Sequence, residues 1–269
     1  TYCRNVGKRR RWEFAIKNNQ NEKKILSETY IWNFLKPWLK KSEAYLERKA
    51  IYTFKSAISR KWRKGRIFIA GDAAHLMPPF MGQGMCAGIR DASNLAWKIV
   101  KCLKQNHSEK ILDSYQSERF PNAKEYIETT MRMGEFVNAI ESTQITDNIS
   151  SNQDGTKSMQ SIKPKLGPGL GKNKDINRGI IFPQLKMKNG KAFDYKFSKN
   201  LLLIVTPELK NKSKLCKFPT IIANEVAGLS NLLKSYNSKA IIIRPDRFIF
   251  QSCNSVKNFG KFLKSLNNF

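Results

Sequence analysis

The sequence predicts an α/β protein built from two parts, and three observations support this fold class. A short apolar strand at 66–70 runs through Gly71 and a proline-containing loop into a helix that starts after Gly84. A second helical tract follows from Ile111 to about Ile140. Beyond residue 200, strand patterns alternate with helix patterns, which is typical of a small α/β unit.

The first 60 residues predict short, mixed elements. Residues 1–16 read as two short strands around a glycine turn, and 49–59 reads as another strand. Residues 28–46 have helical spacing, although Pro37 must start or kink a helix there.

The helix after Gly84 is predicted to be amphipathic. One stripe carries apolar residues, namely Ala92, Leu95, Ala96, Ile99, Val100 and Leu103. The charged residues Arg90, Asp91, Lys98 and Lys101 fall largely on other faces.

Residues 142–177 are rich in Ser, Asn, Gln, Gly and Lys and predict a linker. Beyond this linker, the sequence predicts three strands and two helices. The strands are 201–205, 240–245 and 247–252, and the helices are Val226–Leu233 and Val256–Leu266.

Length and composition set limits on the class of protein. The chain has 269 residues, 41% of them hydrophobic, so it can bury a core. No apolar run is long enough to cross a bilayer, and no secretory signal pattern is found. Because the first residue is Thr1, either the chain was processed or it is a piece of a longer protein.

The formal net charge is +28. This charge fits either a nucleic-acid or anionic-membrane partner, or a lysine-rich composition spread over solvated faces. We favour the second interpretation, because the basic residues are scattered and no nucleic-acid-reading module surrounds the clusters at Lys8–Arg11 and Arg60–Lys64. No specific nucleic-acid partner is expected, and a homo-oligomer is left open.

Cysteine and histidine usage is informative about location. Five cysteines without a CxxC spacing argue against a disulfide framework, and two histidines argue against a histidine-rich metal centre. A reducing, cytoplasmic location and no metal site are therefore expected.

The candidate chemistry lies in IFIAGDAAHLMPPFMGQGMCAGIRDASNLAWKIV, residues 67–100. In open α/β sheets, ligands bind beyond the carboxyl ends of strands, where Asp72 follows a strand and Gly71. A carboxylate there accepts hydrogen bonds from ligand hydroxyls, or it caps the next turn. Gly82-Gln83-Gly84 opens the next helix, whose first N–H groups can face an electron-rich ligand.

Neighbouring polar residues have two interpretations each. His75 could be a general base, but we favour a structural residue of the motif. Asp91 and Asn94 are interpreted as fixing the helix against its neighbours, and Cys86 as a small packed residue rather than a reactive thiol. The catalytic base is therefore not assigned.

The string GDAAHLMPPFMGQGMCAGIRDASNLAWK (71–98) resembles the second flavin-binding motif of the FAD-dependent aromatic-ring hydroxylases of the para-hydroxybenzoate hydroxylase type. Within that family it resembles the 3-(3-hydroxyphenyl)propionate hydroxylase subgroup, as does GKRRRWEF (7–14). GIIFPQ (179–184) and IIIRPDRFIF (241–250) resemble the subgroup's thioredoxin-like C-terminal domain.

The resemblance implies roles for particular residues. Asp72, after Gly71, would bond the ribityl hydroxyls of FAD, and Pro79 would lie beside the isoalloxazine. Backbone N–H groups of the Gly82–Cys86 segment would face flavin N1 and the C2 carbonyl. The implied cofactor-binding residues are Gly71, Asp72, Pro79, Gly82, Gln83, Gly84, Met85 and Cys86.

The resemblance also implies the reaction and the domain plan. NAD(P)H reduces FAD, which activates O2 to hydroxylate a small phenolic substrate. The implied domains are the end of a substrate-binding sheet segment (1–64), the C-terminal part of an FAD/NAD(P)-binding fold (65–141), the linker (142–178) and a thioredoxin-like domain without CxxC (179–269).

One signature of the family is not found in this sequence. No GxGxxG occurs, and GPGLGK (167–172) has neither a preceding strand nor a clean following helix. The chain is therefore expected to be a C-terminal portion that is inactive and binds FAD poorly by itself. Two alternatives stay open at this point, namely a related flavoprotein oxidoreductase with a non-phenolic substrate and a basic nucleic-acid-binding or scaffold protein.

Overall fold

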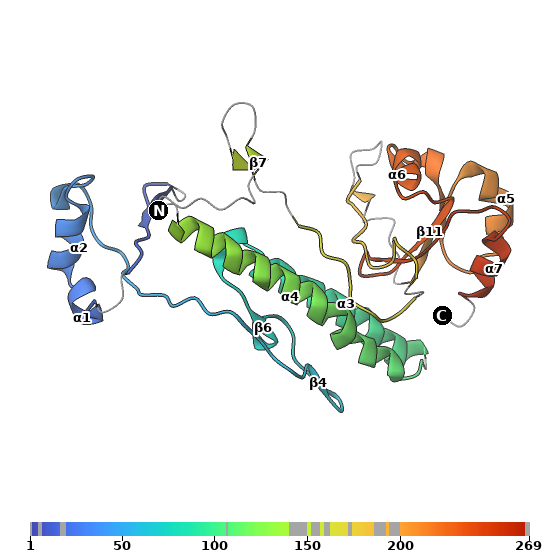
Figure 1. Cartoon of the computed structure of the whole chain (residues 1–269), viewed down its shortest axis with the longest axis horizontal. Coiled ribbons are helices and arrows are strands. Elements are labelled where there is room, and N and C mark those ends of the chain that lie inside the picture. Colours follow the sequence, from blue (N-terminus) through green and yellow to red (C-terminus); the bar gives the residue numbers. More distant parts are fainter. Residues whose placement is uncertain are drawn as a thin grey trace. The chain divides into compact units, whose positions relative to one another are not determined.

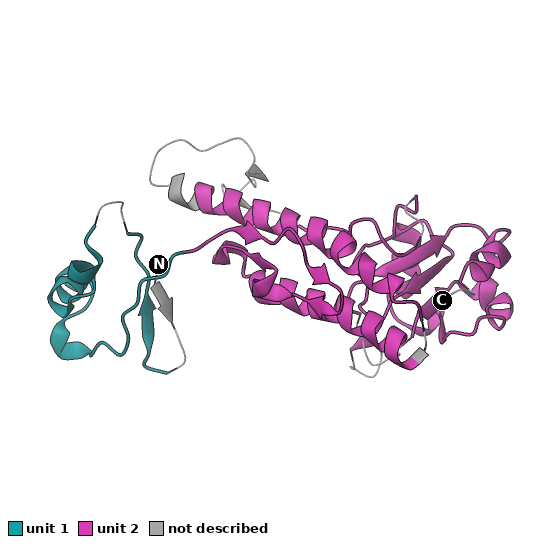
Figure 2. Cartoon of the chain, turned by 90° about the horizontal axis from the view of Figure 1, so that it is seen from below, with its two compact units in different colours: residues 1–53 teal, residues 54–269 magenta. Residues whose placement is uncertain are grey.

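The computed structural model divides the chain into two compact units, residues 1–53 and 54–269 (Figure 2). It describes residues 2–4, 7–16, 20–105, 107–139, 150–151, 157–158, 162–171, 174–185, 192–193 and 200–266. Among the helices in these ranges, none combines the length and the apolar composition that crossing a bilayer requires.

The first unit contains a two-stranded antiparallel sheet and short helices. Strand β1 (Tyr2–Arg4) pairs with β2 (Arg10–Trp12), which confirms the predicted pair of strands. The helices are α1 (Glu22–Ile25), α2 (Glu28–Leu35) and the 3₁₀ turn η1 (Lys41–Glu43). The prediction of helical structure over 28–46 was too long, because Pro37 cannot continue the hydrogen-bond ladder of α2.

Aromatic contacts hold the first unit together. The Trp12 and Trp38 rings lie 5.7 Å apart, and the Phe14 and Phe34 rings lie 4.5 Å apart edge to face. Leu35 is the one fully buried residue among the described side chains of this unit. The unit therefore has a small, half-exposed aromatic core.

The second unit begins with two short antiparallel strand pairs around a tryptophan core. Strand β3 (Ala57–Ile58) pairs with β6 (His75–Leu76), and β4 (Arg63–Lys64) pairs with β5 (Ile67–Phe68), all antiparallel. Trp62 lies at the centre of this core, 1% exposed. The strands predicted over 49–59 and 66–70 shrink to two residues each, because only these residues find a partner strand.

Two long helices follow and lie side by side (Figure 1). They are α3 (Gly84–Gln105) and α4 (Lys110–Ala139), and they confirm both predicted helical tracts. Two 3₁₀ turns, η2 (Gly71–Ala73) and η3 (Pro79–Met81), connect β5 to α3.

Helix α3 buries polar residues as well as apolar ones, the latter including Ala87 and Trp97. Its buried face carries polar residues at heptad spacing, namely Asp91, Asn94, Lys98 and Lys101 after Ala87. Its exposed positions include the apolar residues Met85, Ile89, Ala92, Ala96, Val100 and Leu103. The sequence predicted an apolar stripe that also contained Leu95 and Ile99, but the structure packs these two residues against the core, near the buried Trp97.

The chain ends in a four-stranded mixed sheet of order β10-β9-β11-β12. Strands β9 (Leu202–Val205) and β10 (Thr220–Ile222) are parallel, whereas β11 (Ala240–Ile243) is antiparallel to β9 and to β12 (Ile249–Cys253). The helices are α5 (Lys210–Ser213), α6 (Leu229–Ser235) and α7 (Phe259–Lys264), with 3₁₀ turns η5 (Pro207–Leu209) and η6 (Ala223–Glu225).

This sheet has a core on each face. Leu229 and Leu233 of α6 contact one face, and Phe259 and Phe262 of α7 contact the other. The sequence predicted strands β9, β11 and β12 and helices α6 and α7, but it missed strand β10 and helix α5. Residues 179–182 extend the sheet, because Ile181 bridges to Phe248 and Gly179 N donates to Ile249 O over 2.9 Å.

Much of the predicted linker at 142–178 lies outside the described residues. Within it, β7 (Ser150–Ser151) pairs with β8 (Lys157–Ser158). The described part from 162 onwards contacts α4, since Gly167 N donates to Glu118 O over 2.8 Å. Gly169 lies so close to Glu118 that a Cβ at 169 would meet the Glu118 side chain at 2.3 Å.

A buried charge cluster joins the two helices to the C-terminal sheet. Glu118 of α4 accepts two hydrogen bonds from Arg244, at 2.8 and 2.9 Å, and one from Lys98 of α3 at 2.8 Å. Asn94 donates to both Glu118 and Asp246 over 3.0 Å. All five residues are buried. Four of them are at most 1% exposed, and Asp246 is 5% exposed.

The pKa values of this cluster follow from burial and charge. Burial alone would raise the pKa of Glu118, but the charges of Arg244 and Lys98 outweigh it and hold that pKa well below its usual range. Burial lowers the pKa of Lys98 to about 8, against the opposing effect of Glu118. Glu118 and Lys98 therefore form a buried ion pair at neutral pH.

We expect Glu118→Gln to lower the free energy of unfolding by about 3–5 kcal/mol, because it leaves the buried Arg244 and Lys98 without their shared counter-charge. Urea unfolding followed by circular dichroism measures this. Glu125→Gln, at an exposed position of the same helix, is the matched control and should leave stability nearly unchanged. Equal stability of the two variants would contradict the structural role of the cluster.

Candidate functional site

The glycine–aspartate motif lies directly against the first turns of α3. Gly71 has φ +59°, a left-handed conformation that favours glycine. A Cβ atom added to Gly88 of α3 would lie only 3.3 Å from the Cα atom of Gly71. Two glycines therefore allow the backbone after β5 to approach the helix closely, which puts Asp72 beside the beginning of α3.

Asp72 is exposed, and its carboxylate makes no hydrogen bond or ion pair with the described residues. Neither η2 nor η3 has a side-chain capping bond, so the structure shows no capping role for Asp72. An unpaired carboxylate beside a backbone turn is able to accept hydrogen bonds from hydroxyl groups of a ligand.

The loop before α3 is a tight turn that ends at a glycine. Pro79 begins η3, and Gly82 closes it with φ +60° while its N–H donates to Pro79 O over 2.8 Å. The Gly82 amide is thus already engaged within the turn. Gly84 is the first residue of α3, so the amides available to a ligand are those of Gly84, Met85 and Cys86 in the first helical turn.

The side chains around this turn differ in exposure. Met85 is 76% exposed, whereas Cys86 is half-buried. Arg90 donates to Gln83 Oε1 over 3.1 Å, and its guanidinium lies 4.6 Å from the centre of the Tyr126 ring. Sequence reasoning missed this Arg90–Tyr126 contact, because Tyr126 lies on α4, far along the chain.

A buried carboxylate holds the motif in place. Asp91 Oδ2 accepts from Gly71 N at 3.0 Å and lies 2.7 Å from His75 Nε2, while Asp91 Oδ1 accepts from Arg119 Nε at 2.8 Å. Arg119 also contacts the Ala87 carbonyl at 3.4 Å. These bonds confirm the structural interpretation of His75 and Asp91, and they add Arg119, which the sequence did not single out.

Burial alone would raise the pKa of Asp91, but the His75 hydrogen bond and the Arg119 charge outweigh it and lower that pKa below its ordinary value. Asp91 is therefore an anion that binds the strand tip, β6, and helix α4 together. None of these groups is exposed, so the cluster positions the motif and does not itself face a ligand.

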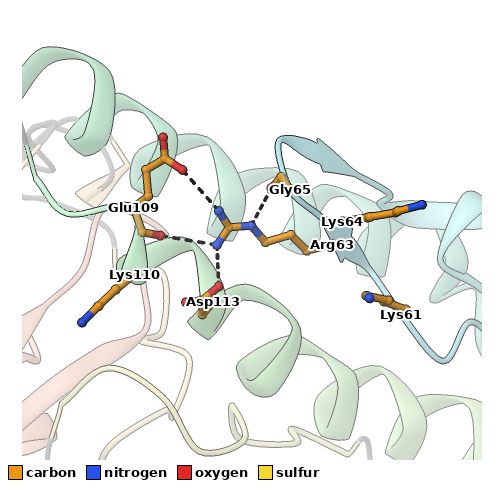
Figure 3. Close-up of a pocket in the computed structure, with 7 residues that line it drawn as sticks. All are labelled: Lys61, Arg63, Lys64, Gly65, Glu109, Lys110 and Asp113. Carbon is orange, nitrogen blue, oxygen red and sulfur yellow. Dashed lines mark hydrogen bonds and ion pairs between the residues drawn. The ribbon is translucent and has the colours of Figure 1, made fainter.

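An open hollow of about 380 Å³ lies elsewhere, where the β4–β5 hairpin meets the start of α4 (Figure 3). Arg63 spans it, donating to Asp113 Oδ1 over 2.5 Å and to Gly65 O over 2.9 Å. None of the candidate cofactor-binding residues lines this hollow. We therefore assign the candidate site to the motif and not to the hollow.

A strand tip with an unpaired carboxylate, a left-handed glycine turn and a glycine-opened helix together offer a ligand one hydrogen-bond acceptor and several backbone donors. Residues 10–130 match the protein family described as "FAD binding domain".

Relatives with assigned names extend the match. Over 182 residues the chain is 36% identical to a "Probable NADH-specific resorcinol 4-hydroxylase" of Rhodococcus jostii, covering 67% of this chain and 34% of that protein. It is 26% identical to a "3-(3-hydroxy-phenyl)propionate/3-hydroxycinnamic acid hydroxylase" of Klebsiella pneumoniae, covering 89% of this chain and 52% of that protein. The chain thus spans between a third and about half of these two relatives.

Solved structures share the fold. Aklavinone-11 hydroxylase with FAD and aklavinone superposes with a TM-score of 0.53 at 18% identity, over 79% of this chain and 45% of that one. The flavin-dependent monooxygenase PieE, in complex with FAD and substrate, superposes with a TM-score of 0.54 at 15% sequence identity. This match covers 80% of this chain and 49% of PieE. The resemblance to the FAD-dependent aromatic-ring hydroxylases and the predicted fold class are confirmed.

We expect the stability that Asp91 supplies to be lost in acid. Its pKa is lowered in the folded state, so the unfolded chain takes up the proton first, and stability falls as the pH drops below the ordinary value of 3.8. Thermal unfolding midpoints between pH 7 and pH 3 measure this. The Asp91→Asn variant should have a lower unfolding midpoint at pH 7, and this midpoint should fall less steeply as the pH drops.

The matched control is Asp72→Asn, which changes an exposed carboxylate of the same motif. The unfolding midpoint of this variant should change with pH in the same way as that of the unaltered chain. Identical slopes for the Asp91→Asn variant and the unaltered chain would count against the role of Asp91.

Proposed function

We propose that this chain forms the C-terminal portion of an NAD(P)H-dependent FAD monooxygenase that hydroxylates a small phenolic substrate with O2. The observation that carries this proposal is the approach of the Gly71–Asp72 turn to the first turn of α3, within the segment that matches the FAD-binding family. The names of the relatives in Rhodococcus and Klebsiella support a phenolic ring as substrate.

The residues present fit the cofactor. The unpaired carboxylate of Asp72 would accept hydrogen bonds from the ribityl hydroxyls, and the left-handed turn at Gly71 packs against Gly88 of α3. The amides of Gly84, Met85 and Cys86 would face the pyrimidine end of the isoalloxazine, with Gly82 and Gln83 shaping the turn and Pro79 at the substrate side.

The bound flavin would supply the redox chemistry, and the chain would supply position and charge. The positive end of a 22-residue helix favours an electron-rich ligand without any reorganisation of the protein. Asp91 fixes this helix end relative to the Gly71 turn through buried bonds. We therefore assign Asp72 and the helix amides to binding, and Asp91, His75 and Arg119 to positioning.

The proposal extends to the isolated chain and to its location. The candidate residues provide a site for the flavin end of FAD, so the chain alone should bind FAD poorly and be inactive.

The C-terminal part of the chain carries Cys216 and Cys253 as free thiols without a CxxC spacing, so a redox role for this part is not proposed. Four free thiols among the described residues fit a cytoplasmic location.

We expect the chain to bind FAD stoichiometrically only when the upstream part of a relative is joined to it. The test joins the N-terminal part of the Rhodococcus jostii protein to this chain and measures bound flavin by absorbance after gel filtration. Asp72→Ala should lower FAD affinity at least about tenfold, because it removes charge-assisted hydrogen bonds to the ribityl chain.

The control is Asp113→Ala, which removes an exposed carboxylate at the remote hollow and should leave flavin occupancy unchanged. Consumption of NADH or NADPH with resorcinol or 3-hydroxyphenylpropionate present then tests the substrate class. Unchanged occupancy in the Asp72→Ala variant would overturn the assignment of the site.

A further inference from the structure

The C-terminal sheet carries most of its lysines on one side, that of helices α5 and α7. Residues 207–218 and 254–266 form this side, because their apolar residues belong to the core that α7 makes with the sheet. The segments contain a single carboxylate, Glu208, which pairs with Lys239 over 2.9 Å. Their seven lysines are all exposed, namely Lys210, Lys212, Lys214, Lys217, Lys257, Lys261 and Lys264. We call this surface the lysine face.

The opposite side of the same sheet is balanced in charge. Residues 219–238, which include α6, contain one acidic residue, Glu225, and one basic residue, Lys234. In the whole chain, 49 Lys and Arg stand against 21 Asp and Glu, whereas the lysine face has seven Lys and one Glu. The lysine face is therefore a local concentration of positive charge beyond the basic composition of the chain, and it fits a polyanionic partner.

The two segments of the lysine face lie side by side, as Figure 1 shows for α5 and α7. Lys261 and Lys264 lie on the outer side of α7, away from the buried Phe262. A small hollow of about 50 Å³ separates the segments. It is lined by Leu215, Cys216, Lys217, Phe218, Leu263 and Leu266.

An exposed apolar side chain lies among these lysines. Leu215 is 86% exposed, more than any other large hydrophobic residue that the structure describes. Phe218 and Leu263 are half-buried beside it, and the Lys217 ammonium lies 5.4 Å from the centre of the Phe218 ring. Such a surface can insert a leucine between lipid chains while the ammonium groups stay at the level of the headgroups.

This chemistry favours an anionic membrane surface over nucleic acid. The lysine face contains no arginine, the residue that binds bases and phosphates through two parallel hydrogen bonds. Its described aromatic rings are buried or half-buried, so none is presented for stacking on bases. A lipid surface instead offers diffuse negative charge for flexible lysines and an apolar layer for Leu215. A second copy of the lysine face would be repelled, since both copies carry the same charge.

From these observations we propose that the lysine face binds the surface of an anionic phospholipid membrane, with Leu215 inserted between the lipids. Basic clusters of about four to eight residues bind such membranes, and each lysine strengthens the binding roughly fivefold. The inference is independent of the proposed function, because none of the candidate cofactor-binding residues belongs to the lysine face.

The test mixes the full chain with vesicles of phosphatidylcholine, with or without phosphatidylglycerol, and measures binding by co-sedimentation at about 0.1 M salt. The chain should bind the anionic vesicles and leave the neutral ones unbound. Replacing Lys214, Lys217 and Lys264 together with Gln should weaken this binding about a hundredfold. Leu215→Ser should weaken it at least about tenfold, because it removes the inserted apolar side chain.

The matched control replaces Lys36, Lys41 and Lys49 with Gln, which removes the same charge from exposed positions of the first unit. This variant should bind anionic vesicles within about twofold of the unaltered chain, because distant exposed charges are screened. All the replaced side chains are exposed, so the circular dichroism spectra of the variants should equal that of the unaltered chain.

Several outcomes overturn the inference. The first is equal binding, or none, to the two kinds of vesicle. The second is a loss of binding in the control variant as large as that in the lysine-face variant. The third is an unchanged affinity of the Leu215→Ser variant for anionic vesicles. The last is tighter binding to duplex DNA or RNA than to vesicles, measured in parallel by fluorescence anisotropy, which would assign the lysine face to nucleic acid.

Discussion

The arrangement of the candidate site depends on one buried carboxylate, Asp91. It accepts hydrogen bonds from the Gly71 amide and from Arg119, and it contacts His75, with no exposure to water. Burying an ion is costly unless it is paired, so removing Arg119 would leave the Asp91 charge without its guanidinium partner. This constraint holds the strand tip and the first turns of α3 in one relative position.

Two consecutive residues of α4 serve two different clusters. Arg119 contacts Asp91 at the flavin motif, whereas Glu118 contacts Lys98, Asn94 and Arg244 of the C-terminal sheet. Neighbouring helical residues point about 100° apart, so one turn of α4 reaches both. The C-terminal sheet thereby supports the helix whose beginning carries the candidate site, although it contributes none of the candidate cofactor-binding residues.

Local sequence signals identified the elements that are defined by local chemistry. Gly71 and Gly82 were expected where the backbone needs freedom, and both have positive φ. The long helices and strands β9, β11 and β12 of the C-terminal sheet followed from apolar periodicity and length, whereas the short strand β10 was missed. Short strands near residues 49–70 were overestimated, because a strand persists only where a partner exists, and the sequence does not show partners.

The sequence by itself determined that residues 84–105 form a helix, since helical periodicity is a local property of the chain. Only the tertiary structure decided that the polar residues Asp91, Asn94 and Lys98 face inward. Glu118, Arg119 and Asp246 lie 20 to 152 residues away in the chain and offer the polar residues of α3 their ion pairs and hydrogen bonds. Because charge pairing between distant segments has no periodic signature, the inward turn of Asp91 and Lys98 could be read only from the folded molecule.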